Sequence, residues 1–153
     1  MTYRTIVVGT DGSDSAERAV EHSVDLAAAD QARLVIVTAY ERTDTTPDER
    51  APADVRWMMA DPNEAERHAR RARTLATERG VGDVVVQALE GEPADELLEA
   101  ADTFDADLIV VGSVGLTDSS RFLLGSVASS VLHHAPCDVL VVHSHTPRPA
   151  AAQ

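Results

Sequence analysis

Hydrophobic residues recur along the chain in short, nearly continuous runs that are rich in Val, Ile and Leu. Such runs are typical of strands in a parallel sheet whose two faces are both covered by helices. They span Thr5–Val8, Leu34–Ala39, Val84–Leu89, Leu108–Val111 and Val139–Val142. The pattern therefore predicts a buried parallel sheet of five strands.

The segments between these runs have helical periodicity. In Ser15–Ala29 the apolar side chains fall on one stripe and the acidic ones lie elsewhere, as in a helix that covers a core. Glu64–Arg79 is charged and rich in alanine; Pro62 near its start and Gly80 after its end are typical helix boundaries. Further helices are predicted over Pro93–Ala101 and Ser126–His134.

The alternation of strands and helices predicts a doubly wound α/β sandwich with right-handed crossovers. With 153 residues the chain is expected to form a single domain over residues 1–145, and residues 146–153 are expected to be a disordered tail. Thr43–Asp61 is the one long irregular stretch, with Trp57 within it. Its length suggests a flap or a partner-contacting loop, and local packing is the alternative.

Charge excludes several classes of function. The chain has 26 acidic and 13 basic residues, a net charge of -13, and every basic residue is Arg. Without Lys there is no Walker A loop, kinase lysine or Schiff base. The acidic excess argues against partners such as nucleic acid or an anionic membrane. It also indicates either compositional drift in a GC-rich genome or a halophilic cytoplasm with molar salt, where charge is screened within about 3 Å.

The remaining composition points to an intracellular protein. Cys137 is the only cysteine, so neither an internal disulfide nor a cysteine-rich zinc site is possible. The start, MTYRTIVVGTDGS, lacks a signal-type segment, and no apolar stretch approaches the ~20 residues of a membrane span. We expect a soluble, cytoplasmic protein.

The loop after the first strand, Gly9–Ser15, is a candidate ligand site. In an open α/β sheet, ligands bind outside the carboxyl ends of the strands where the strand order reverses. Asp11 leaves the first strand at such an end, where its carboxylate can accept from sugar hydroxyls. The alternative role is that of a turn residue bonded to its own backbone, with Ser13 or Ser15 capping the next helix.

A second candidate loop follows the fourth strand. It contains Gly112 and Gly115, and Gly125–Ser126 then opens the last helix. Glycines let the backbone approach a ligand closely, and a helix N-terminus adds unpaired N–H donors and partial positive charge. Phosphate could therefore be held without Lys. The alternative is an ordinary linker with a serine cap.

The spacing Gly112-x2-Gly115-x9-Gly125-Ser126, with VVGTDGS near the start and HHAPCDVLVV near the end, resembles the universal stress protein family. The resemblance extends from Tyr3 to about His143. It implies a Rossmann-like fold with strand order 3-2-1-4-5, and many members bind ATP or related adenine nucleotides.

The resemblance also implies roles for individual residues. Asp11 would bind the ribose hydroxyls, Gly9 and Thr10 would lie close to the nucleotide, and Val37 would flank the adenine. The residues implied to wrap the ribose and phosphates are Gly112, Ser113, Val114, Gly115 and Leu116, and those implied to offer amides and one hydroxyl to the phosphates are Gly125, Ser126 and Val127.

The chain departs from the resemblance at one point. Many members have His or Arg at the position of Val114, and the acidic Asp118 follows the second glycine here. A carboxylate repels phosphates unless a divalent cation intervenes. Asp118 either faces solvent or helps to hold Mg²⁺, and Arg121 either clamps phosphate or is simply exposed.

The sequence thus predicts an adenine-nucleotide-binding regulatory or stress-response protein with little or no turnover and no catalytic residue. The alternatives are a slow ATPase and a homodimeric interaction module that needs no nucleotide. The last strand, Val139–Val142, would lie at the sheet edge, and the family commonly dimerises through it. His133, His134, His143 and His145 flank this strand and are expected to be solvated or at an interface, not metal ligands.

Overall fold

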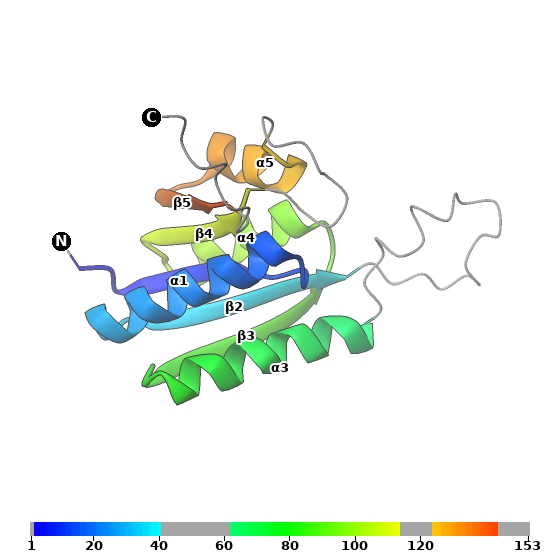
Figure 1. Cartoon of the computed structure of the whole chain (residues 1–153). Coiled ribbons are helices and arrows are strands. Elements are labelled where there is room, and N and C mark those ends of the chain that lie inside the picture. The colour runs from blue at the N-terminus through cyan, green and yellow to red at the C-terminus, as the bar shows by residue number, and fades with distance from the viewer. Residues whose placement is uncertain (1, 41–61, 114–123, 144–153) are drawn as a thin grey trace, which may run out of the picture.

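The computed structural model describes residues 2–40, 62–113 and 124–143, which form a parallel sheet with helices on both faces (Figure 1). The strands are β1 (Thr5–Gly9), β2 (Arg33–Tyr40), β3 (Asp83–Glu90), β4 (Leu108–Gly112) and β5 (Asp138–Val142). The helices are α1 (Asp14–Asp30), α3 (Pro62–Glu78), α4 (Pro93–Thr103) and α5 (Ser126–His134). Every predicted element is confirmed, with ends that differ by at most two residues.

The strand order is β3-β2-β1-β4-β5, as the sequence led us to expect. β1 lies at the centre, where Ile6 is in register with Leu34 of β2 and with Leu108 of β4. All neighbouring strands are parallel, so their carboxyl ends meet at one edge of the sheet. The strand order reverses between β1 and β4, which makes their carboxyl ends the expected place for a ligand.

Alternate residues of the strands fill two separate cores. In β1, Ile6 and Val8 pack with α1 and α3 on one face of the sheet, and Val7 packs with α4 and α5 on the other. All three side chains are fully buried. Figure 1 shows α1 and α3 together in front of the sheet and α4 and α5 behind it. Successive side chains of a strand point to opposite faces of the sheet. Because all of these side chains are apolar, both helical layers pack on apolar surface.

Local chemistry sets the ends of α1. Ser13 is the N-cap, because its side-chain oxygen accepts from the amide of Ala16 at 3.3 Å. Asp14 and Glu17 add acidic side chains to the first turn, where the helix dipole favours negative charge. The helix ends at Gln31, which adopts a left-handed conformation with φ 55°. Of the two serines that could cap this helix, Ser13 is therefore the one that does so.

Carboxylates hold the amino edge of the sheet, opposite the expected site. Asp107 accepts from the amides of Arg4 and Thr5 at 2.9 and 3.0 Å, which joins the starts of β1 and β4. The hydroxyl of Tyr3 donates to Asp138 at 3.0 Å, and this bond raises the pKa of the tyrosine. Acidic residues at this edge thus serve the fold.

Two expectations concern segments outside the described residues. The predicted flap, Thr43–Asp61, and the predicted tail, 146–153, both lie there. No helix in the described part of the chain is long and apolar enough to cross a membrane.

Candidate functional site

The loop between β1 and α1 is held in place by its own hydrogen bonds. The amide of Thr10 donates to the carbonyl of Val37 on β2 at 3.0 Å, which ties the loop to the neighbouring strand. The amide of Ser13 donates to Oδ1 of Asp11 at 2.9 Å, so Asp11 has the turn role that the sequence allowed. A carboxylate has two acceptor oxygens, so Oδ2 can accept from a ligand while Oδ1 holds the turn. The two roles proposed for Asp11 are therefore compatible.

Two glycines let the backbone of this region pack closely. A Cβ on Gly9 would lie 2.9 Å from Cδ1 of Leu97, a flexible side chain of α4. A Cβ on Gly112 would lie 2.8 Å from the carbonyl carbon of Ser15 and 2.9 Å from the amide nitrogen of Ala16. These last two atoms belong to the backbone of α1 and cannot move independently. Gly112 is thus needed for the packing of β4 against α1, whatever it contributes to a ligand.

Ser113 connects three elements at the end of β4. Its amide donates to the carbonyl of Val142 at the end of β5 (2.8 Å), and its carbonyl accepts from the amide of Gly125 at 2.7 Å. Ser113 is buried, with 4% of its surface exposed. This pair of bonds places the start of α5 next to the carboxyl ends of β4 and β5. The structure thereby brings Gly112 and Ser113 together with Gly125 and Ser126, which lie far from them in sequence.

The N-terminus of α5 has the features of an anion-binding helix end. Gly125 is the N-cap residue and supplies no side-chain cap, and the first turn contains no acidic residue. Ser126 is exposed and Val127 half-buried. The first N–H groups of a helix lack intrahelical acceptors, and the dipole makes this end partly positive. By contrast, the N-terminus of α1 is capped by Ser13 and has acidic residues in its first turn.

Val37 lies inside the sheet near the end of β2. It is 2% exposed and packs in the core on the α4 side, while its carbonyl accepts from Thr10. The backbone of Val37 thus lies at the carboxyl edge of the sheet, next to the loop between β1 and α1 that contains Asp11 (the Asp11 loop). Val114, Gly115 and Leu116, together with Asp118 and Arg121, lie outside the described residues.

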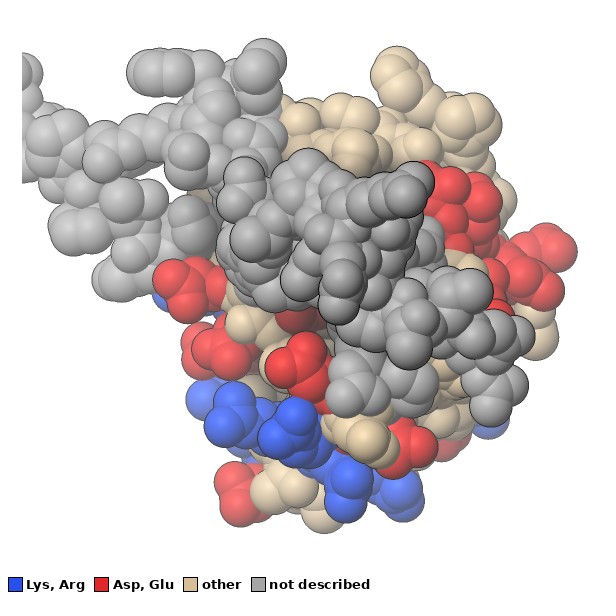
Figure 2. Space-filling view, turned by 90° about the vertical axis from the view of Figure 1, so that its right-hand side faces the viewer, with Lys and Arg blue, Asp and Glu red and all other residues tan. Residues whose placement is uncertain are grey.

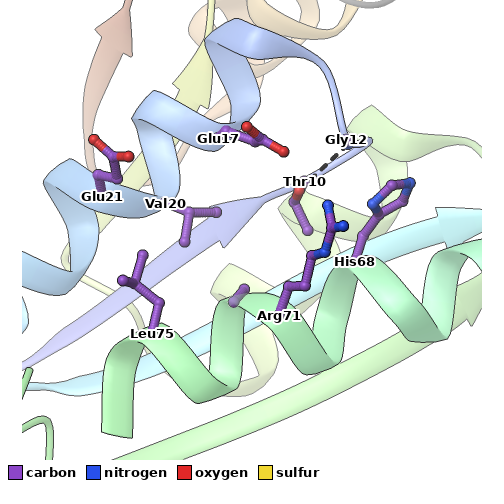
Figure 3. A pocket seen from close by; sticks show the side chains of 9 residues that line it. Thr10, Gly12, Glu17, Val20, Glu21, His68, Arg71 and Leu75 are labelled. Atoms are coloured by element: carbon purple, nitrogen blue, oxygen red, sulfur yellow. Dashed lines mark hydrogen bonds between the residues drawn. The ribbon is translucent and has the colours of Figure 1, made fainter. Parts of the chain in front are cut away.

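A hollow of about 140 Å³ lies beside the Asp11 loop, between α1 and α3 (Figure 3). Thr10 and Gly12 form its wall on the loop side, and His68 and Arg71 of α3 face them. The apolar part of the lining comes from both helices, and Glu17 and Glu21 of α1 form the acidic part. The complete lining is Thr10, Gly12, Glu17, Val20, Glu21, His68, Arg71, Ala72 and Leu75.

Sequence reasoning did not single out His68 or Arg71. Both stand in a helix whose periodicity indicates only a solvated face, and the approach of α3 to the β1–α1 loop is a tertiary contact. The one sequence signal is the glycine at position 12. It has φ +81°, and a Cβ there would clash with the imidazole of His68.

Cys137 and the histidines of the last helix stand apart from this edge. Burial raises the pKa of the Cys137 thiol, and the negative charges of Asp107 and Asp138 raise it further. The raised pKa disfavours a nucleophilic thiolate. His133 and His134 are exposed and their rings meet edge to face at 6.4 Å. Among the described residues, no group of three or more His, Cys, Asp or Glu side chains is arranged to hold a metal ion.

Comparison with known proteins assigns the family. The sequence profile of the universal stress protein family matches residues 2–143. The chain belongs to this family. The universal stress protein Rv1636 of Mycobacterium tuberculosis H37Rv is 39% identical over 145 residues, 93% of this chain and 97% of that protein. The universal stress protein MJ0531 of Methanocaldococcus jannaschii is 36% identical over 143 residues, 92% of this chain and 82% of that protein.

Solved structures of the family are also similar. A universal stress protein in complex with cAMP is 40% identical with a TM-score of 0.68, and the match covers 94% of this chain and 99% of that one. The universal stress protein of Archaeoglobus fulgidus in complex with dAMP is 28% identical with a TM-score of 0.68, covering 93% and 99%. UspA of Lactobacillus plantarum has a TM-score of 0.77 at 26% identity, covering 93% and 99%.

Proposed function

We propose that this protein binds an adenine nucleotide, with ATP as the expected ligand, at the carboxyl ends of β1 and β4. The observation that carries the proposal is the meeting of two segments there. The Ser113–Gly125 hydrogen bond (2.7 Å) brings the start of α5 to the edge where Asp11 leaves β1. Asp11 offers a carboxylate oxygen to ribose hydroxyls, and α5 offers N–H groups to phosphate. The cAMP and dAMP complexes of similar proteins support an adenine nucleotide as the ligand.

The residues present suit a nucleotide that arrives with Mg²⁺. Asp11 is a half-buried carboxylate at this edge, and oxygen ligands of this kind suit Mg²⁺. The cation would neutralise part of the phosphate charge in a chain of net charge -13. We propose a regulatory, stress-response role in which the nucleotide is held with little or no turnover. Slow hydrolysis is the alternative, and a steady-state phosphate-release assay with a Ser126→Ala control detects it.

Replacement of Asp11 tests the proposed ribose contact. We expect Asp11→Ala to weaken ATP binding about tenfold or more, because a charge-assisted hydrogen bond to the ligand is lost. Asp14→Ala is the matched control: it removes the same charge three residues away, from an exposed position. Isothermal titration calorimetry at fixed Mg²⁺ measures both. Equal affinities for the two variants would contradict the role given to Asp11.

We also propose that two copies associate through β5. This strand lies at the edge of the sheet, and its residues Val139, Leu140 and Val141 are only half-buried. An apolar edge with unpaired backbone groups favours pairing with another strand. We expect sedimentation equilibrium in high salt to give a dimer with or without ATP. A monomer under both conditions would contradict this assembly.

A further inference from the structure

Positive charge on this acidic protein gathers over α3. Arg67, Arg70, Arg71 and Arg73 all belong to this helix and are exposed. In Figure 2, which views the molecule onto the carboxyl ends of the strands, arginine forms a continuous blue area in the lower part, where α3 lies. By contrast, α4 has acidic residues and no arginine. The charge is therefore segregated, and its positive part lies at the same end of the molecule as the candidate site.

Three of these arginines form a ridge, and Arg70 is the one member with a described ion pair. Arg67 stands three and four residues before Arg70 and Arg71, so all three side chains lie on one face of α3. Like charges at these spacings destabilise a helix. Arg70 forms an ion pair with Glu66 at 3.8 Å, and because both side chains are exposed this pair cancels little of the charge. No described ion pair includes Arg67 or Arg71.

The ridge reaches the candidate site through Arg71. Its side chain extends from α3 toward Thr10, and His68 lies beside Gly12 (Figure 3). Glu17 and Glu21 face Arg71 from α1 across the hollow, but neither is within 4.0 Å ion-pair distance of it. The carboxylates of Glu17 and Glu21 on α1 thus repel a phosphate group, and the guanidinium of Arg71 on α3 attracts it.

We propose that the arginine ridge, Arg67, Arg70 and Arg71, recruits the phosphate-bearing nucleotide to the carboxyl edge. This inference rests on the proposed function and adds to it the surface that attracts the ligand. Electrostatic attraction by a local patch raises association rates even when the whole protein repels the ligand, and it depends steeply on salt. The ligand class is a nucleotide with several phosphate charges. Uncharged adenosine gains nothing from the ridge.

The test compares two triple variants with the same net charge. Arg67→Gln/Arg70→Gln/Arg71→Gln removes the ridge. Arg4→Gln/Arg33→Gln/Arg79→Gln removes three exposed arginines from the opposite, amino edge; there Arg33 starts β2 next to Asp83, and Arg79 follows the last turn of α3. Each variant moves the net charge from -13 to -16 by loss of three positive charges. Denaturant unfolding checks that both variants are folded.

The readout is the association rate of ATP and adenosine that both carry a fluorescent N-methylanthraniloyl group, measured by stopped flow at fixed Mg²⁺. At about 10 mM salt we expect the ridge variant to bind labelled ATP about tenfold more slowly and the amino-edge variant less than twofold more slowly. Labelled adenosine should be unaffected, and the difference should vanish near 1 M KCl, where screening acts within about 3 Å.

The outcomes separate this inference from the proposed function. Wild-type protein that binds labelled ATP while the two triple variants slow equally, or not at all, would overturn recruitment by the ridge and leave the nucleotide site standing. Wild-type protein that binds neither labelled nor unlabelled ATP in calorimetry would overturn both. Slower binding of ATP confined to the ridge variant supports the inference.

Discussion

Gly112→Ala is expected to lower the free energy of unfolding by about 3 kcal/mol. The added Cβ would lie 2.8 and 2.9 Å from two backbone atoms of α1, the carbonyl carbon of Ser15 and the amide nitrogen of Ala16. Real Cβ atoms do not approach backbone this closely, so β4 and α1 must separate. Both elements contribute to the buried core around β1, and their separation loosens that packing. Urea unfolding followed by circular dichroism measures the loss.

Gly82→Ala is the matched control for this prediction. Gly82 precedes β3, and no atom lies within 4 Å of a Cβ built on it. The same change in composition should therefore alter stability by less than about 0.5 kcal/mol. If Gly112→Ala were as stable as Gly82→Ala, the close approach of β4 to α1 described here would be wrong.

Gly12→Ala is expected to cost about 2 kcal/mol for two separable reasons. The residue has φ +81°, a conformation that costs an L-residue about 1 kcal/mol or more. In addition, its Cβ would clash with the imidazole of His68. The second cause is a side-chain clash, and a side chain can be removed. The double variant Gly12→Ala/His68→Ala should therefore lose about 1 kcal/mol less free energy of unfolding than the sum of the losses of the two single variants.

Gly80 offers the control for the conformational part. It has φ +93° and no atom within 4 Å of an added Cβ, so Gly80→Ala suffers backbone strain without a clash. We expect a loss of about 1 kcal/mol, half that of Gly12→Ala. Additive stabilities in the double-mutant cycle of Gly12 and His68 would show that the imidazole turns away from the added Cβ at little cost, and would contradict the predicted clash.

Most of the fold could be predicted because local pattern and topology agree. The short, nearly continuous runs of Val and Ile are typical of strands that are buried on both faces of a parallel sheet. The helical connections between parallel strands are right-handed, which limits the possible topologies. The capping residue of α1 could not be chosen from sequence. Ser13 and Ser15 are both good N-caps, and the bond from Ala16 to Ser13 decides between them only in three dimensions.

The candidate site could be predicted in part. The glycine spacing identified Gly112 and Gly125, and the fold shows why they meet: Ser113 bonds to both β5 and the start of α5. Sequence reasoning placed Gly112 either at the ligand or in an ordinary linker and missed its contact with α1. Substitution of Gly112 could therefore abolish nucleotide binding by disturbing the fold as well as the site. Substitution of Asp11 tests the site more specifically.

The contribution of α3 could not be predicted, because it depends on packing. His68 and Arg71 are far from residues 10–12 in sequence, and α3 reaches them through its contacts with β2, β3 and α1. The sequence suggested that backbone amides, one helix terminus, a divalent cation and, in one of its two possible roles, Arg121 attract a polyanion against the net charge. The fold adds a concentrated patch of arginine to that group at the same edge.

Binding of adenine nucleotide where β1 and β4 end and α5 begins is tested most directly by nuclear magnetic resonance. Protein labelled with ¹⁵N is titrated with ATP and Mg²⁺, and the chemical shifts of its amides are followed. We expect the largest changes at residues 10–13 and 125–127, with small changes at the amino edge around Arg33 and Asp107. Absence of shifts at millimolar ATP, or shifts confined to another surface such as α4, would contradict it.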